Sequence, residues 1–139
     1  MFKHPFFVFL FVMLVVLVVI NNTALRHFWY WSYPWFDIVT HFMGGFWVGG
    51  MLLWFLFLSG KKVDNAVRTR TLFIKTAVFV LVVALFWEGI EYGIGAVSII
   101  QKGYFSDTIG DLFVGVAASL VVTSVFLLKK YHIQKITAS

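Results

Sequence analysis

Residues 72–95 read LFIKTAVFVLVVALFWEGIEYGIG. The only charged residues in this run are Lys75 near its start and Glu88 and Glu91 near its end. At about 1.5 Å per residue, a helix of this length crosses a hydrocarbon core of about 30 Å. The run therefore predicts a transmembrane helix that carries two carboxylates close to one of its ends.

Three further apolar runs accompany this one, at Pro5–Ile20, Phe36–Leu58 and Asp107–Leu128. The chain of 139 residues is 61% hydrophobic and 12% charged, which is about half the charged fraction of a soluble protein. We therefore predict an all-α fold, a four-transmembrane-helix bundle that forms a single integral membrane domain over residues 1–139. The helices are expected at about residues 2–20, 36–58, 72–95 and 107–128.

The first apolar run is the shortest, and it spans a membrane only if Phe2 and Lys3 extend it. A signal peptide with Lys3 and His4 as its charged start is the alternative interpretation. The following Asn22-Thr23-Ala24 is a poor cleavage site. We therefore interpret the run as a retained first helix.

The basic residues predict how the bundle is oriented. Nine of the eleven Lys and Arg residues precede the first helix, surround the second loop or follow the fourth helix, and only Arg26 and Lys102 lie on the other side. The positive-inside rule then places both termini in the cytoplasm. The net charge of +5 is thus a topology signal. We expect no nucleic-acid partner, because no soluble domain carries a basic stripe.

Five of the six acidic residues and one histidine lie inside or at the mouths of the apolar segments. An ionisable residue in a bilayer is costly and is a candidate for function. Residues three or four positions apart share one helix face, and in the predicted topology all three faces meet in one layer near the outer boundary. The residues are Asp37, His41, Glu88, Glu91, Asp107 and Asp111.

Structural explanations compete with function at some of these positions. Asp37 and Asp107 lie at expected helix starts, where a carboxylate complements the helix dipole, and Ser106 resembles an N-cap. Glu88 and Glu91 lie near a helix C-terminus, where the dipole disfavours negative charge. The glycines on the faces below the acids are explained by close helix packing alone.

The acidic residues predict a metal site. Five carboxylates in a confined, partly dry space cannot all stay ionised, so either some hold protons or cations compensate them. We favour a bound divalent metal ion, of which Mg, Mn, Zn, Ca and Fe suit oxygen ligands with one imidazole. The chain has no cysteine, which excludes thiolate ligands. The expected metal ligands are His41, Glu88, Glu91 and Asp111, with Asp37 and Asp107 as catalytic acid or base.

The aromatic stretch between the first two helices is a candidate substrate platform. Its alternative interpretation is an interfacial aromatic belt. A lipid headgroup or a sugar ring would lie over the metal site, and basic residues would meet a phosphate. The expected substrate-binding residues are Arg26, Trp31, Trp35, Tyr92, Lys102 and Tyr104.

Three short motifs, taken together, resemble a known group of proteins. They are Asp37-Ile-Val-Thr-His41, Glu88-Gly-Ile-Glu91 and Asp107-Thr-Ile-Gly-Asp111. Their order and spacing resemble the small VanZ-like and YjdF-like bacterial membrane proteins, over about two-thirds of the chain. The resemblance implies a cell-envelope setting, and we expect a multi-pass protein of a bacterial or archaeal plasma membrane.

Three functions remain open from the sequence. The first is a metal-dependent hydrolase or transferase acting on a lipid-linked or cell-envelope substrate at the outer leaflet. The second is a cation or proton binding or transport protein. The third is a non-catalytic accessory subunit. Membrane lipids are the expected partners, and the glycine-rich faces also fit a homodimer or a second membrane protein.

Overall fold

The structure is a computed structural model that describes residues 4–59, 68–93 and 104–137, with side chains in the last range described for residues 105–129. Within these ranges the chain forms α1 (Pro5–Arg26), α2 (Trp29–Ser32), α3 (Trp35–Phe57), α4 (Thr69–Gly93) and α5 (Tyr104–Thr137). The long helices are apolar enough to give four candidate membrane spans. The predicted all-helical, four-span fold is confirmed.

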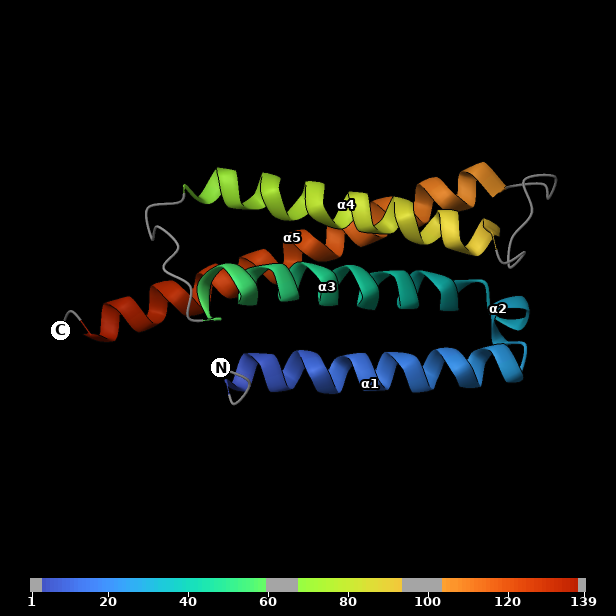
Figure 1. Cartoon of the computed structure of the whole chain (residues 1–139), viewed down its shortest axis with the longest axis horizontal. Coiled ribbons are helices and arrows are strands. Elements are labelled where there is room, and N and C mark those ends of the chain that lie inside the picture. Colours follow the sequence, from blue (N-terminus) through green and yellow to red (C-terminus); the bar gives the residue numbers. More distant parts are fainter. Residues whose placement is uncertain (1–3, 60–67, 94–103, 138–139) are drawn as a thin grey trace.

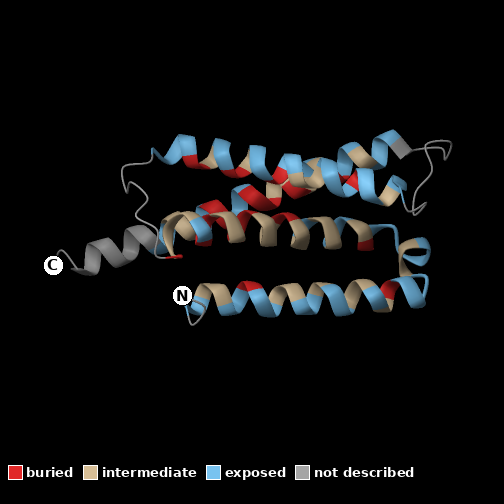
Figure 2. Ribbon diagram, viewed as in Figure 1, coloured by how far each residue is buried: buried red, intermediate tan, exposed pale blue. Residues whose placement is uncertain are grey.

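The long helices alternate in direction, so the start of α1 and the end of α5 lie at the same end of the bundle (Figure 1). α5 packs against both α3 and α4, whereas α1 packs against α3 and α2. Among the described residues, no Cα atom of α1 lies within 8 Å of one in α4. Figure 2 shows the result, with buried residues gathered on α5 and the facing side of α3 and with α1 largely uncovered.

Glycines on α3 set how closely it approaches α5. A Cβ added at Gly45 would lie 2.6 Å from the Cα of Gly115, and one added at Gly49 would lie 3.0 Å from Cγ1 of Val122. At Gly45 the backbones of α3 and α5 therefore meet directly, whereas Gly49 packs closely against the Val122 side chain. The packing interpretation of the glycines holds at these positions.

The contact between α1 and α3 also depends on a glycine. A Cβ added at Gly50 would lie 2.7 Å from Cδ2 of Leu10, which is fully buried. Gly44 is different, because an added Cβ there would meet no heavy atom within 4 Å. Gly44 therefore faces open space.

The apolar core lies toward the end of the bundle that holds the start of α1. Its buried residues are Leu53, Leu72 and Val122, packed against Phe6, Phe46, Phe57, Phe126 and Leu127.

α1 ends at Arg26, beyond the predicted boundary at residue 20. Phe2 and Lys3, with which we expected the helix to begin, lie outside the described residues. Asn22 Nδ2 donates to the carbonyl of Val18 at 2.8 Å, and Thr23 Oγ1 donates to that of Val19 at 2.8 Å. These polar side chains bond to the preceding turn, so the helix continues through them.

The chain reverses at Phe28 into the short helix α2, which the sequence did not predict. Phe28 has a φ of 57°, a left-handed conformation that is rare for a bulky residue. Trp31 and Ser32 then donate backbone hydrogen bonds to the carbonyl of Phe28 at 3.2 Å and 3.0 Å. α2 thus covers the junction between α1 and α3.

α5 begins at Tyr104 and ends at Thr137, so it extends beyond the predicted range of 107–128 at both ends. We expected Ser106 to be the N-cap of this helix, but it lies inside the helix. Asp107 still lies in the first turn.

Candidate metal site

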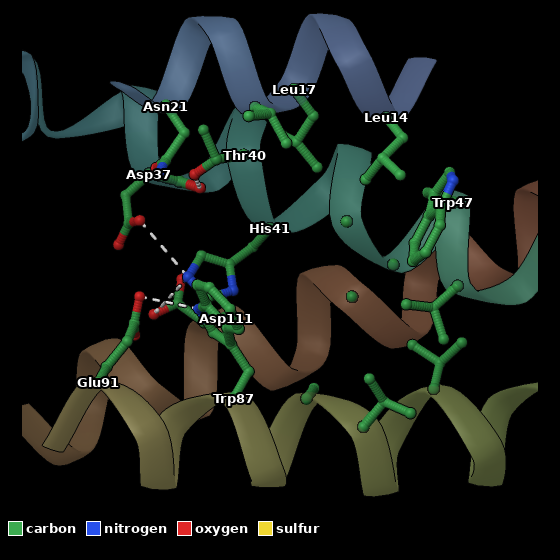
Figure 3. Close-up of a pocket in the computed structure, with 18 of the residues that line it drawn as sticks. Leu14, Leu17, Asn21, Asp37, Thr40, His41, Trp47, Trp87, Glu91 and Asp111 are labelled. Atoms are coloured by element: carbon green, nitrogen blue, oxygen red, sulfur yellow. Dashed lines mark hydrogen bonds and ion pairs between the residues drawn. The ribbon is translucent and has the colours of Figure 1, made fainter. Parts of the chain in front are cut away.

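His41 lies at the centre of the candidate site, one turn after Asp37 on α3. Its Nε2 atom is 3.4 Å from Oδ1 of Asp37 and 3.8 Å from Oδ2 of Asp111 on α5. Figure 3 shows the imidazole between these two carboxylates. The His41 and Asp111 side chains are only 13% and 10% exposed, so a low-dielectric environment strengthens their interaction.

α4 supplies two further carboxylates to the same histidine. His41, Glu88 and Glu91 offer ligand atoms that all lie within 4.8 Å of one another, and Asp37, His41 and Asp111 form a second such group. His41 belongs to both groups. The structure therefore brings together five of the six expected ionisable residues from three helices.

Hydrogen bonds from neighbouring residues fix the two glutamates. Trp87 Nε1 donates to Oε1 of Glu91 at 2.8 Å, and Thr108 Oγ1 donates to Oε2 of Glu88 at 3.0 Å. Each bond engages one carboxylate oxygen and leaves the other available to an ion. Outer partners of this kind orient metal ligands and tune their affinity.

The carboxylates of Asp37 and Asp111 lie somewhat beyond the distance of a direct charge-assisted hydrogen bond to His41. A charge-assisted N–H···O hydrogen bond is about 2.7–2.9 Å long, and both carboxylates lie farther than that from Nε2. Two ligands bound about 2.1 Å from one ion at a tetrahedral angle lie about 3.4 Å apart. The 3.8 Å separation between Nε2 of His41 and Oδ2 of Asp111 is compatible with two ligands of one ion as well as with a long ion pair.

A cavity of about 360 Å³ opens beside the site. Its walls come from all five helices, and none of its described lining residues is a lysine or an arginine. The carboxylates therefore lack a fixed positive partner other than His41. Its polar end is lined by Asn21, Asn22, Tyr30, Asp37, Thr40, His41, Glu91 and Asp111.

Tyr30 on α2 lines the polar end of the cavity. Its hydroxyl donates to Oδ1 of Asn21 at 2.6 Å. Burial raises the pKa of the Tyr30 phenol above its usual value of 10.0, so the hydroxyl keeps its proton and remains a donor. This hydrogen bond links α2 to α1.

The other predicted site residues that the structure describes belong to neither candidate metal group and do not line the cavity. Asp107 is exposed in the first turn of α5 and belongs to neither candidate metal group. Arg26, Trp31, Trp35 and Tyr92 are exposed and do not line the cavity. Lys102 and the side chain of Tyr104 lie outside the described residues.

Sequence reasoning missed the residues that support the site. Trp87 lies four positions before Glu91, a helical spacing that the sequence already displays. The bond from Thr108 to Glu88 joins two helices, and the bond from Tyr30 to Asn21 depends on the reversal at Phe28. Those two pairs leave no local pattern in the sequence.

The chain matches, over residues 2–132, the family described as "Predicted membrane protein (DUF2238)". The chain belongs to this family. Membership of DUF2238 agrees with the four apolar helices and identifies the chain as a multi-pass membrane protein. Searches of curated proteins and of solved structures found no match.

Proposed function

We propose that this protein is a membrane-embedded, divalent-metal-dependent hydrolase or transferase that acts on a lipid-linked substrate of the cell envelope. The observation that carries the proposal is the position of His41, which is shared by two groups of carboxylates from three helices. Four carboxylates close to one imidazole, with no lysine or arginine among the described residues of the cavity wall, form a strongly cation-attracting site.

In this proposal the ion is held by His41, Glu88, Glu91 and Asp111. It activates a water molecule or polarises a phosphoryl oxygen of the substrate. Asp37 is the better placed of the two expected catalytic acids, because its side chain lies on the cavity and is 30% exposed. We assign it the role of general base or acid. Asp107 remains a second candidate at the rim.

The site faces the outer leaflet of a bacterial or archaeal plasma membrane in this proposal. The start of α1, the end of α5 and the ends of α3 and α4 that border their connection lie at one end of the bundle (Figure 1). In the sequence, nine of the eleven basic residues precede α1, lie in or near the connection between α3 and α4, or lie near the end of α5, which supports cytoplasmic termini. The resemblance to VanZ-like and YjdF-like proteins supports a cell-envelope setting.

Elemental analysis of the detergent-purified protein tests the metal site. We expect about one divalent ion per chain in the wild type, lost in His41→Ala and Glu88→Gln because each removes a ligand. Asp107→Asn is the matched control and should retain the ion. A metal-free wild type after chelator-free purification would contradict the proposal.

Turnover tests the catalytic role separately. Asp37→Asn should keep its fold and most of its metal but lose hydrolysis or transfer on phosphate-bearing lipid-linked substrates. Retained turnover in Asp37→Asn and in Asp107→Asn would contradict the acid or base assignment, even in a protein that binds metal.

Cation or proton transport is the second candidate function, favoured by buried hydroxyls toward the other end of the bundle. Thr76, Ser119 and Thr123 are fully buried. Each hydroxyl, however, donates to a carbonyl of its own helix, so the hydroxyls do not form a continuous polar path. Ion flux in proteoliposomes that is lost in His41→Ala would favour transport over catalysis.

A further inference from the structure

We infer that the cavity between α1 and α4 holds one hydrocarbon chain of a phospholipid from the surrounding bilayer, with the lipid phosphate directed toward the ion at His41. The position of the phosphate rests on the proposed function, because it requires the ion. The position of the hydrocarbon chain rests on the cavity alone.

The cavity changes from polar to apolar along its length. His41, Asp111 and Glu91 line one end, and Figure 3 shows Leu14, Leu17 and Trp47 farther along the same space. A phospholipid has the same order, with a charged phosphate followed by a hydrocarbon chain. The apolar lining is completed by Val48, Val80, Val83 and Ala84.

The length of the cavity corresponds to one leaflet. The lining residues on α3 run from Asp37 to Val48, which at about 1.5 Å per residue is on the order of 16 Å along the helix. A bilayer core is about 30 Å thick, so the cavity spans about half of it. With the polar end that takes the phosphate included, the cavity therefore reaches about as deep as one leaflet, and its apolar part holds the first segment of the chain.

The side between α1 and α4 gives the chain its entrance. Among the described residues, no Cα atom of α1 lies within 8 Å of one in α4, although both helices line the cavity. An unfilled apolar space loses the dispersion contacts of its walls, and such a space does not attract water. A hydrocarbon chain from the bilayer is therefore the molecule that we expect in the apolar part of the cavity.

Gly44 offers a way to fill this space by mutation. It lines the cavity, and a Cβ added there would meet no heavy atom within 4 Å. The Cβ of Gly44→Leu therefore meets no obstacle, and because Gly44 lines the cavity we expect the rest of the leucine side chain to enter it; the Tm of the variant checks that the bundle is intact. Gly89 on α4 is the matched control, because its Cβ position is equally open but it is exposed and does not line the cavity.

The experiment places the full chain in vesicles of phosphatidylethanolamine and phosphatidylglycerol that contain a trace of phosphatidylglycerol with a diazirine in one acyl chain. After illumination, mass spectrometry locates the labelled residues. We expect Leu14 and Val83 in the wild type to be labelled above the outward-facing Val82, which is 59% exposed. Gly44→Leu should lower the labelling of Leu14 and Val83 severalfold, and Gly89→Leu should not.

Metal content measured on the same samples separates this inference from the proposed function. Labelling of Leu14 and Val83 that does not exceed that of Val82, in a protein that holds its ion, would overturn the lipid inference alone. Enriched labelling that Gly44→Leu abolishes in a metal-free protein would overturn the metal proposal and the phosphate placement. Wild-type labelling that falls when a chelator removes the ion would support both.

Discussion

Gly45 on α3 and Gly115 on α5 lie in direct backbone contact, one helical turn from His41 and Asp111 respectively. Because each glycine follows its ionisable residue by four positions, the two glycines and the two ligands share one packed interface. The same close approach that brings the backbones together holds the His41 imidazole 3.8 Å from the Asp111 carboxylate. The packing of α3 against α5 therefore determines the distance between these two residues of the candidate site.

Gly45→Ala should separate α3 from α5 and weaken the site. The added Cβ would lie 2.6 Å from the Cα of Gly115, and overpacking of this kind costs about 1–3 kcal/mol. Thermal unfolding in detergent and metal content should both fall. Gly115→Ala is the control, because its Cβ would lie 3.9 Å from Cγ1 of Val80, an ordinary contact. Equal losses in the two variants would contradict this interpretation.

Removing the outer hydrogen bonds should weaken metal binding without abolishing it. Trp87→Phe removes the donor to Glu91, and Thr108→Val removes the donor to Glu88. Losses of this kind lower metal affinity about 10–100-fold, measurable by calorimetric titration of the metal-stripped protein. Trp35→Phe alters a tryptophan that is 59% exposed and should leave the affinity unchanged. Unaltered affinity in Trp87→Phe would show that Glu91 needs no such support.

Chelation should destabilise the wild-type protein. An ion that binds only the folded state at 100 times its dissociation constant stabilises it by about 2.7 kcal/mol. Removing it with a chelator should therefore lower the Tm, and restoring the divalent ion should reverse the change. The His41→Ala variant should hold no ion, so its Tm should not change on addition of the chelator or of the divalent ion. A chelator effect of the same size in that variant would place the ion elsewhere.

Tyr30 should make the protein sensitive to alkaline pH. Burial raises the pKa of the folded-state phenol above the usual 10.0, so the folded state favours the protonated form. The contribution to stability is complete below pH 10.0 and is lost as the pH rises through the folded-state pKa. Tyr30→Phe cannot lose a phenolic proton, so its unfolding profile should be flatter at high pH.

At neutral pH the same variant should be slightly less stable, because it loses the hydrogen bond to Asn21, worth about 0.5–1.5 kcal/mol. Tyr33→Phe alters an exposed tyrosine and serves as the control. Unfolding curves for the wild type and Tyr30→Phe that stay parallel from neutral to strongly alkaline pH would contradict the assignment.

Hydropathy predicted the four spans because each run is long and apolar enough to be recognised without tertiary contacts. The helix ends were harder to predict. α1 continues through Asn22 and Thr23 because these side chains bond to carbonyls one turn back, which reduces the cost of their polarity. α2 depends on Phe28 in a left-handed conformation, and a phenylalanine gives no sequence signal for that turn.

The clustering of the ionisable residues could be predicted because such residues stand out in apolar segments and share helix faces. The cavity could not be predicted, since it depends on how far α1 stands from α4. That separation follows from tertiary packing, in which Leu10 of α1 seats against Gly50 of α3. The exposed positions of Trp31 and Trp35 likewise depend on the direction in which α2 turns.

The peripheral packing of α1 has a consequence for biosynthesis. α1 has a mean hydropathy of 2.6, the highest of the four spans, and α3 has the lowest at 1.4. α1, which leaves the ribosome before α3, is thus the span best suited to remain alone in lipid. α3 enters with Asp37 and His41 and has only α1 and α2 as earlier neighbours. Asp111 arrives on α5, so the candidate site is complete only after α5 has been inserted.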